Sequence, residues 1–229
     1  MNGCGYKHHP LLHKELNAET SAIVKPHREE QSCNTHQSGS SSILFRYIPV
    51  VVYGCGIAVH CYAFLDDGSS KTLMDGELAK ELNLSGERHP LCLKWTGGLH
   101  RAEDDSLSVQ IEISGLKGKR FHFEDVRTIT ELQLPCQTLD VQQLQAEYCY
   151  LKGVPAQSYR DVRPQLLIGV QHANATLVRK SREGKPGQPI AIKTNLGWTI
   201  YGGTSTDQFT NMVHYTNHVI TRLKIQMQT

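Results

Sequence analysis

The 229-residue sequence lacks the features that mark a membrane-spanning, secreted or nucleic-acid-binding protein. None of its apolar runs approaches the roughly 20 residues that a membrane span needs, and its first residues lack the apolar centre of a secretory signal. The net charge of +2 is too small to make nucleic acid or an anionic membrane the expected partner. With 39% hydrophobic residues, the chain can form a packed core over part of its length.

Cysteines are present, but they lack the paired spacing of a disulfide framework. The seven cysteines are scattered along the chain at positions 4, 33, 55, 61, 92, 136 and 149. An odd number of unpaired thiols is typical of a reducing compartment. We therefore expect a cytoplasmic protein with free thiols.

The composition changes near residue 44 and again near residue 204. Residues 16–43 are polar and rich in His, Ser and Gln, which predicts a flexible linker. Residues 204–229 contain no strong pattern and are interpreted as a linker or tail. Residues 44–203 carry short apolar runs bounded by glycine and other turn residues, and they indicate one folded domain.

The pattern within this domain predicts many short strands and only two short helices. The apolar runs 48–53 and 58–65 flank Gly54-Cys55-Gly56 and predict a hairpin. Thr96-Gly97-Gly98 is a second glycine turn, expected to lie between a strand at 91–95 and the alternating strand 107–113. The remaining expected strands are 119–129, 165–169, 190–193 and 197–202, and the expected helices are 75–82 and 137–152. These elements predict a mainly β, closed barrel-like domain.

The stretch Phe64 to Asp75, FLDDGSSKTLMD, holds the main candidate site, because an apolar strand ends there in two carboxylates, a glycine and two hydroxyls. An ordinary surface turn is one interpretation, since Asp, Gly and Ser favour turns. A calcium loop is excluded because acidic and amide residues do not recur at alternate positions and no Glu closes the loop. A serine nucleophile lacks the G-x-S-x-G elbow.

Three elements in order resemble the retropepsin type of aspartic protease: a strand ending in Asp-x-Gly, a glycine-tipped hairpin and an apolar segment ending in glycine. More closely, LDDGSSKTL, LLIG and LGWTIYG resemble the protease region of Pao/BEL-type retrotransposon polyproteins. The resemblance spans about residues 45–203. It implies an acid-protease fold and an aspartic endopeptidase that cleaves a Gag-Pol polyprotein.

The resemblance also implies roles for the residues of the first element. Asp66 matches the catalytic aspartate, and Gly68 matches the glycine that lets the backbone turn tightly. Asp67 stands where the family usually has Ser or Thr, whose hydroxyl links two active-site loops. Ser69 stands where a small residue is expected and is a candidate hydrogen-bond donor to the catalytic carboxylate.

In this family two carboxylates about 3 Å apart share one proton and activate a water between them. The sequence contains one such triplet after an apolar strand, because Met74-Asp75-Gly76 lacks the spacing and Glu103-Asp104-Asp105 lacks the glycine. The resemblance therefore implies a homodimer with the site on its two-fold axis.

The other two elements imply supporting roles. Trp95, Gly97 and Gly98 match the flap, a hairpin that closes over bound peptide, and an ordinary glycine hairpin is the alternative. Leu167, Ile168 and Gly169 match a helix-start segment that packs behind the active-site loop.

The first 15 residues resemble the tail of a zinc knuckle, with candidate metal ligands Cys4, His9 and His13. Because Met1 stands where another cysteine is expected, we interpret residues 1–15 as a knuckle remnant and expect no zinc or other cofactor. The resemblance further implies that a polymerase region would follow residue 229. The alternative functions are an inactive retroelement relic and a nucleic-acid-binding polyprotein fragment.

Overall fold

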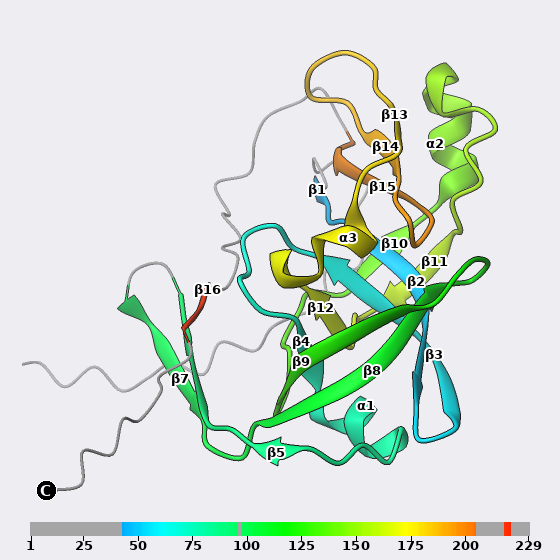
Figure 1. Cartoon of the computed structure of the whole chain (residues 1–229). Coiled ribbons are helices and arrows are strands. Elements are labelled where there is room, and N and C mark those ends of the chain that lie inside the picture. The colour runs from blue at the N-terminus through cyan, green and yellow to red at the C-terminus, as the bar shows by residue number, and fades with distance from the viewer. Residues whose placement is uncertain (1–42, 96–97, 205–217, 221–229) are drawn as a thin grey trace, which may run out of the picture. The chain divides into compact units, whose positions relative to one another are not determined.

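In the computed structural model, which describes residues 43–95 and 98–204 and the backbone of 218–220, the first predicted hairpin is present (Figure 1). It consists of β2 (Tyr47–Gly54) and β3 (Ile57–Leu65), with Gly54 paired to Ile57. The two turn residues, Cys55 and Gly56, have φ angles of 47° and 78°. A turn with two left-handed residues matches the twist of the flanking strands, which explains the tight connection.

A closed six-stranded barrel follows from this hairpin. Its strands are ordered β2-β3-β12-β4-β9-β8, and β8 pairs again with β2 to close the ring. The remaining barrel strands are β4 (Leu73–Asp75), β8 (Leu107–Gly115), β9 (Phe121–Ile129) and β12 (Leu166–Ile168). The short β5 (Glu87–Arg88) pairs with β8 beside the closure. The predicted fold class, a mainly β closed barrel with few short helices, is confirmed.

A second, antiparallel sheet has the order β1-β15-β14-β13 and lies above the barrel in Figure 1, on the side away from α1. Its strands are β1 (Ile43–Leu44), β13 (Lys180–Arg182), β14 (Ile190–Lys193) and β15 (Trp198–Gly203). A two-stranded sheet is formed by β10 (Gln137–Leu139) and β11 (Tyr159–Val162). The helical segments are α1 (Gly76–Glu81), α2 (Val141–Glu147), η3 (Cys149–Leu151), η4 (Val170–His172) and α3 (Ala173–Thr176).

The short strand β12 is apolar throughout because both of its faces are buried. Leu166 and Ile168 belong to the core inside the barrel, whereas Leu167 belongs to a second core that includes residues of the second sheet and of α2. Side chains alternate between the two faces of a strand, so a strand between two cores needs an unbroken apolar run. Phe64 and Leu65 on β3 follow the same rule, with one residue in each core.

Helix α1 begins as the sequence predicts. The carboxylate of Asp75 accepts a hydrogen bond from the Glu77 N–H at 3.0 Å and so caps the helix. Leu78, Ala79 and Leu82 are buried on one face of the helix. This helix lies directly after β4 and contacts β9.

Three expectations about secondary structure are wrong. The strand β6 (Leu91–Lys94) pairs with β7 (His100–Glu103), whereas the prediction paired it with 107–113. The strand β7 was missed because its sequence, HRAE, is mostly polar. The helix expected at 137–152 is divided: Gln137 starts β10, and α2 begins only after Asp140, whose carboxylate caps it.

Two further differences concern segments beyond these. Leu167 and Ile168 lie in the strand expected at 165–169, whereas the helix start that the resemblance implied for Leu167, Ile168 and Gly169 comes only at Val170. Part of the supposedly patternless tail, His218–Ile220, forms β16, whose backbone pairs with β6. None of the helices in the described part of the chain is both long and apolar enough to cross a membrane.

Candidate active site

Asp66 lies at the end of β3, where the strand leaves the barrel core. The parallel strand β12 runs beside β3 with Ile168 opposite Leu65, and the Asp66 N–H donates to the Ile168 carbonyl at 3.0 Å. Asp66 is only 4% exposed. The end of the barrel strand therefore holds a carboxylate in a largely buried position.

The turn after β3 folds back onto this carboxylate. The Gly68 N–H donates to Asp66 Oδ1 at 2.9 Å, and the Ser69 N–H donates to the Asp66 carbonyl at 3.3 Å. The buried Ser69 side chain also hydrogen-bonds the Asp66 carboxylate. Asp66 Oδ2 is buried and has no hydrogen-bond partner among the residues that the structure describes.

Burial raises the pKa of Asp66 above its ordinary value, because removal from water disfavours the charged form. The hydrogen bonds from Gly68 and Ser69 act in the opposite direction, as does the positive charge of Arg46. The negative charge of Asp67 raises the pKa further. The result is a carboxyl group that retains its proton to higher pH than an exposed aspartate does.

The segment after β12 supports the Asp66 turn from behind. The Val170 N–H donates to the Ser69 carbonyl at 2.9 Å, and the Gly169 N–H donates to Thr72 Oγ1 at 3.2 Å. A Cβ on Gly169 would lie 2.4 Å from the Lys71 carbonyl oxygen and 2.6 Å from that of Ser69. Only glycine allows the two backbone segments to approach this closely.

The support continues through Thr72 and His172, which the sequence analysis did not identify. Thr72 Oγ1 lies 2.7 Å from His172 Nδ1, and the imidazole also hydrogen-bonds the backbone of Glu124. The ring stacks on Phe123 with a centroid distance of 3.9 Å and an interplanar angle of 2°. Burial lowers the pKa of His172, so the neutral ring is favoured. No motif marks these residues, since Thr72 and His172 are far apart in sequence.

Asp67 points away from the core, and its side chain is 69% exposed. Its Oδ2 pairs with Arg46 Nη2 at 2.5 Å. Arg46 lies between β1 and β2, and it is a third residue of the site, after Thr72 and His172, that the sequence did not indicate. An arginine in a polar connection gives no signal in the sequence that it will contact a turn formed later in the chain.

The predicted flap is a hairpin in the structure. Strands β6 and β7 are joined by a turn in which the Trp95 N–H donates to the Leu99 carbonyl at 2.8 Å and the Gly98 N–H donates to the Trp95 carbonyl at 3.3 Å. Gly98 has a φ of 83°, a conformation that glycine adopts without strain. Gly97 lies outside the described residues. In Figure 1 the hairpin projects from the side of the barrel.

Trp95 is half-buried and packs against the second core, and the Arg101 guanidinium lies 5.8 Å from its ring centroid. Leu99, at the hairpin end, is 71% exposed. The candidate metal ligands, Cys4, His9 and His13, lie outside the described residues.

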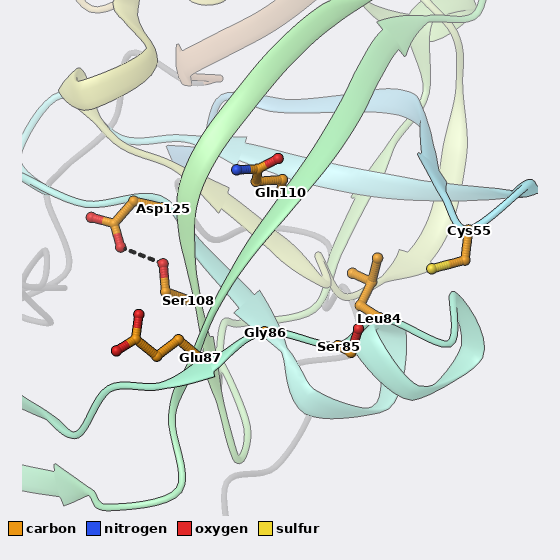
Figure 2. A pocket seen from close by; sticks show the side chains of 8 residues that line it. All are labelled: Cys55, Leu84, Ser85, Gly86, Glu87, Ser108, Gln110 and Asp125. Atoms are coloured by element: carbon orange, nitrogen blue, oxygen red, sulfur yellow. Dashed lines mark hydrogen bonds between the residues drawn. The ribbon is translucent and has the colours of Figure 1, made fainter.

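A hollow of the surface, about 420 Å³ in volume, lies on the outer face of the barrel (Figure 2). It is lined by Cys55, Leu84, Ser85, Gly86, Glu87, Ser108, Gln110 and Asp125. Figure 2 shows the Asp125 and Ser108 side chains joined by a hydrogen bond, and Oγ of Ser108 lies 2.8 Å from Oδ1 of Asp125. Asp125 also accepts from Lys71 Nζ at 2.5 Å. Its carboxylate is thus satisfied on both oxygens.

Comparison of this chain with protein-family models, with curated proteins and with solved structures found no match. The geometry of the Asp66 turn is therefore the basis for the functional assignment. Of the predicted site residues, the structure brings together the turn 66–69 and the segment 167–169. Trp95 and Gly98 form the end of a separate hairpin.

Proposed function

We propose that this chain is a retropepsin-like aspartic endopeptidase of the Pao/BEL retrotransposon type, which cleaves peptide bonds in a Gag-Pol polyprotein. The observation that carries the proposal is the Asp66 carboxylate: it is buried at the end of a barrel strand, and one of its oxygens has no hydrogen-bond partner among the described residues. Buried polar atoms are nearly always paired. A buried carboxylate oxygen without a hydrogen-bond partner, at an Asp-x-Gly turn, is suited to bind and activate a water molecule.

The chemistry needs a second carboxylate, which we assign to Asp66 of a second copy of the chain. Two carboxyl groups about 3 Å apart cannot both ionise, so one keeps its proton. The unpartnered Oδ2 is the atom available to face the second copy or a water. The raised pKa of Asp66 is consistent with a pair that titrates together on the acid side of neutrality.

In the proposed reaction, the ionised Asp66 takes a proton from a water molecule while the water oxygen attacks the scissile carbonyl carbon. The protonated Asp66 of the second copy donates its proton to the carbonyl oxygen, which gives a neutral tetrahedral diol. The first carboxyl group then gives its proton to the amide nitrogen, while the carboxylate of the second copy takes a proton from one diol hydroxyl, so that the C=O bond re-forms as the C–N bond breaks. A new carboxyl and a new amine leave the site, and no cofactor is required.

The hairpin of β6 and β7 is proposed to close over the bound peptide and to exclude water. Its exposed apolar end, Leu99, would contact the substrate. We further propose that the protein acts in the cytoplasm. Of the cysteines that the structure describes, Cys55, Cys61, Cys92 and Cys149 are free thiols, which fits a reducing compartment.

Cleavage of a mixed-sequence peptide library at about pH 5 tests the proposal, with products identified by mass spectrometry. The full chain is compared with Asp66→Asn and with Asp105→Asn as the matched control, because the Asp105 side chain is 94% exposed and pairs only with Arg88 among the interactions described for it. We expect Asp66→Asn to lose roughly a thousandfold or more of the activity, and Asp105→Asn to keep it.

Sedimentation velocity on the same samples reports whether dimers are present. If activity persists in a proven monomer, the shared-site proposal is wrong. If the wild type and Asp66→Asn are equally silent while dimers are present, the chain is an inactive relic of the fold.

A further inference from the structure

Arg46 occupies a defined position at the edge of the candidate site. Its carbonyl oxygen accepts a hydrogen bond from the Leu65 N–H at 3.0 Å, so its backbone is attached to the residue before Asp66. Its side chain is only 20% exposed. The guanidinium carbon lies 5.7 Å from the ring centroid of Tyr201 on β15. Backbone and ring together limit where the guanidinium can lie.

The guanidinium contacts the middle residue of the Asp66 turn. Arg46 Nη2 donates to Asp67 Oδ2 at 2.5 Å. An ionised carboxylate has no hydrogen to donate, so Asp67 cannot make the donor bonds that a hydroxyl would make at this position. The contact with Arg46 replaces them with a charge-assisted hydrogen bond inside one chain.

The pair also changes the electrostatic field at Asp66. The positive charge of Arg46 lowers the pKa of Asp66, whereas the negative charge of Asp67 raises it. These are the charged groups described as acting on Asp66, and the neighbouring strand β12 adds only apolar side chains. When both members are present, their effects on Asp66 partly cancel.

We propose that Arg46 is a positioning residue of the site, which holds Asp67 and thereby the Asp66 turn, and that the Arg46–Asp67 pair sets the pH range in which Asp66 works. The inference rests on the proposed function. It assigns a role to a residue outside the Asp-x-Gly triplet, and it explains how a carboxylate can occupy the middle position.

The test is a cycle of three variants: Arg46→Met, Asp67→Asn and the double variant. Removing Arg46 leaves the Asp67 charge unopposed, so the limb of the pH profile of kcat/KM that reports Asp66 moves to higher pH. Removing Asp67 leaves Arg46 unopposed and moves the same limb to lower pH. Each shift is expected to be on the order of half a pH unit, since Asp67 is largely solvated. The double variant returns close to the wild-type profile.

A closely matched control exists elsewhere on the barrel. Arg120 pairs with Glu112 at 2.9 Å and lies over the Tyr53 ring at 3.7 Å, so it repeats the carboxylate and tyrosine contacts of Arg46 away from Asp66. Arg120→Met should leave the pH profile unchanged. Arg46→Lys, which keeps the charge but loses the planar fork, should keep the position of the limb and lower kcat.

Opposite shifts in the two single variants are the result that a purely structural role would not produce. The proposal is overturned if the wild type cleaves in an Asp66-dependent way while Arg46→Met and Asp67→Asn leave the limb unmoved or shift it in the same direction. If the wild type does not cleave, the proposed function fails. Carboxyl NMR titration of Asp66 in the same variants then shows whether the Arg46–Asp67 pair still changes the ionisation of Asp66. Titration curves that do not move between the variants would also overturn the electrostatic role of the pair.

Discussion

Asp66 and Asp125 belong to the same barrel, but their side chains differ in burial, in hydrogen bonding and in the direction of their pKa shifts. Asp66 is 4% exposed with Oδ2 unpartnered among the described residues, and burial raises its pKa. Asp125 has a side chain that is 38% exposed, with both oxygens bonded. Burial alone would raise the pKa of Asp125, but the bonds from Lys71 and Ser108 outweigh it, and the pKa is lowered.

The difference separates the carboxylate that we propose to be catalytic from one that stabilises the fold. Asp125 has a φ of 50° and lies where the β8–β9 pairing is irregular. Its side chain accepts hydrogen bonds from Lys71 and Ser108 there. Asp66 gains too few partners to offset its burial when it is ionised. An incompletely satisfied buried acid reduces stability at neutral pH, and this is typical of functional sites.

The largest expected effect comes from adding a methyl group to one glycine in each region: Gly169, behind the Asp66 turn, and Gly86, in the hollow that Asp125 also lines. In Gly169→Ala the new Cβ would meet two carbonyl oxygens at 2.4 and 2.6 Å behind the Asp66 turn. In Gly86→Ala it would meet the Ser108 carbonyl oxygen at 2.1 Å beside the outer hollow. Each clash should lower the free energy of unfolding by about 2 kcal/mol or more, measured by urea denaturation.

The two glycine variants should differ in activity, measured per folded molecule at low temperature. Gly169→Ala displaces the Asp66 turn and should lose most of the cleavage. Gly86→Ala leaves that turn in place and should keep it. Equal activity in the two variants would contradict the assignment of the Asp66 region as the site.

The next effect is a change in the free energy of unfolding at pH 7, which should differ in sign between Asp125→Asn and Asp66→Asn. Asp125→Asn removes a carboxylate whose pKa is lowered, and this contribution to stability is present above the unfolded pKa and lost as pH falls through the folded pKa. The variant should lose roughly 1 kcal/mol of unfolding free energy, after allowance for solvent screening of a partly exposed group. Asn tolerates the positive φ at this position.

Asp66→Asn should behave in the opposite way. The folded pKa of Asp66 is raised, so its contribution is fully present below the unfolded pKa and is lost as pH rises through the folded pKa. At pH 7 the variant should be at least as stable as the wild type, with the advantage disappearing near pH 3 to 4, about the ordinary aspartate pKa. A clear loss of stability in Asp66→Asn at pH 7 would remove the contrast between the two sites.

The smallest effect concerns His172, which joins the two regions through its contacts with Thr72 and Phe123. Burial lowers its pKa, with Lys71 acting in the same direction and Asp125 and Glu124 opposing. The unfolded chain then binds a proton more readily, so stability should fall as pH drops below about 6.5, the ordinary histidine pKa. In His172→Gln this part of the pH dependence should disappear, whereas His60→Gln, at an exposed position, should retain it.

Much of the fold could be predicted because its signals are local. The apolar runs of β2 and β3, the two-residue turn between them and the Asp75 cap of α1 depend on neighbouring residues. Pairing partners could not be predicted in the same way. The polar β7 became a strand only because β6 provides its backbone partners, and propensity is weak where pairing decides.

The sequence by itself determined that residues 64–69 would form an apolar strand ending in an Asp-Gly turn, because strand propensity and turn chemistry act within a few residues. It also provided the glycine and the apolar run of 166–169. Only the tertiary structure decided that β12 lies between β3 and β4, that Asp66 keeps one oxygen unpartnered among the described residues, and that Arg46 contacts Asp67. These outcomes depend on which distant segments exclude water together, and no local pattern encodes that choice.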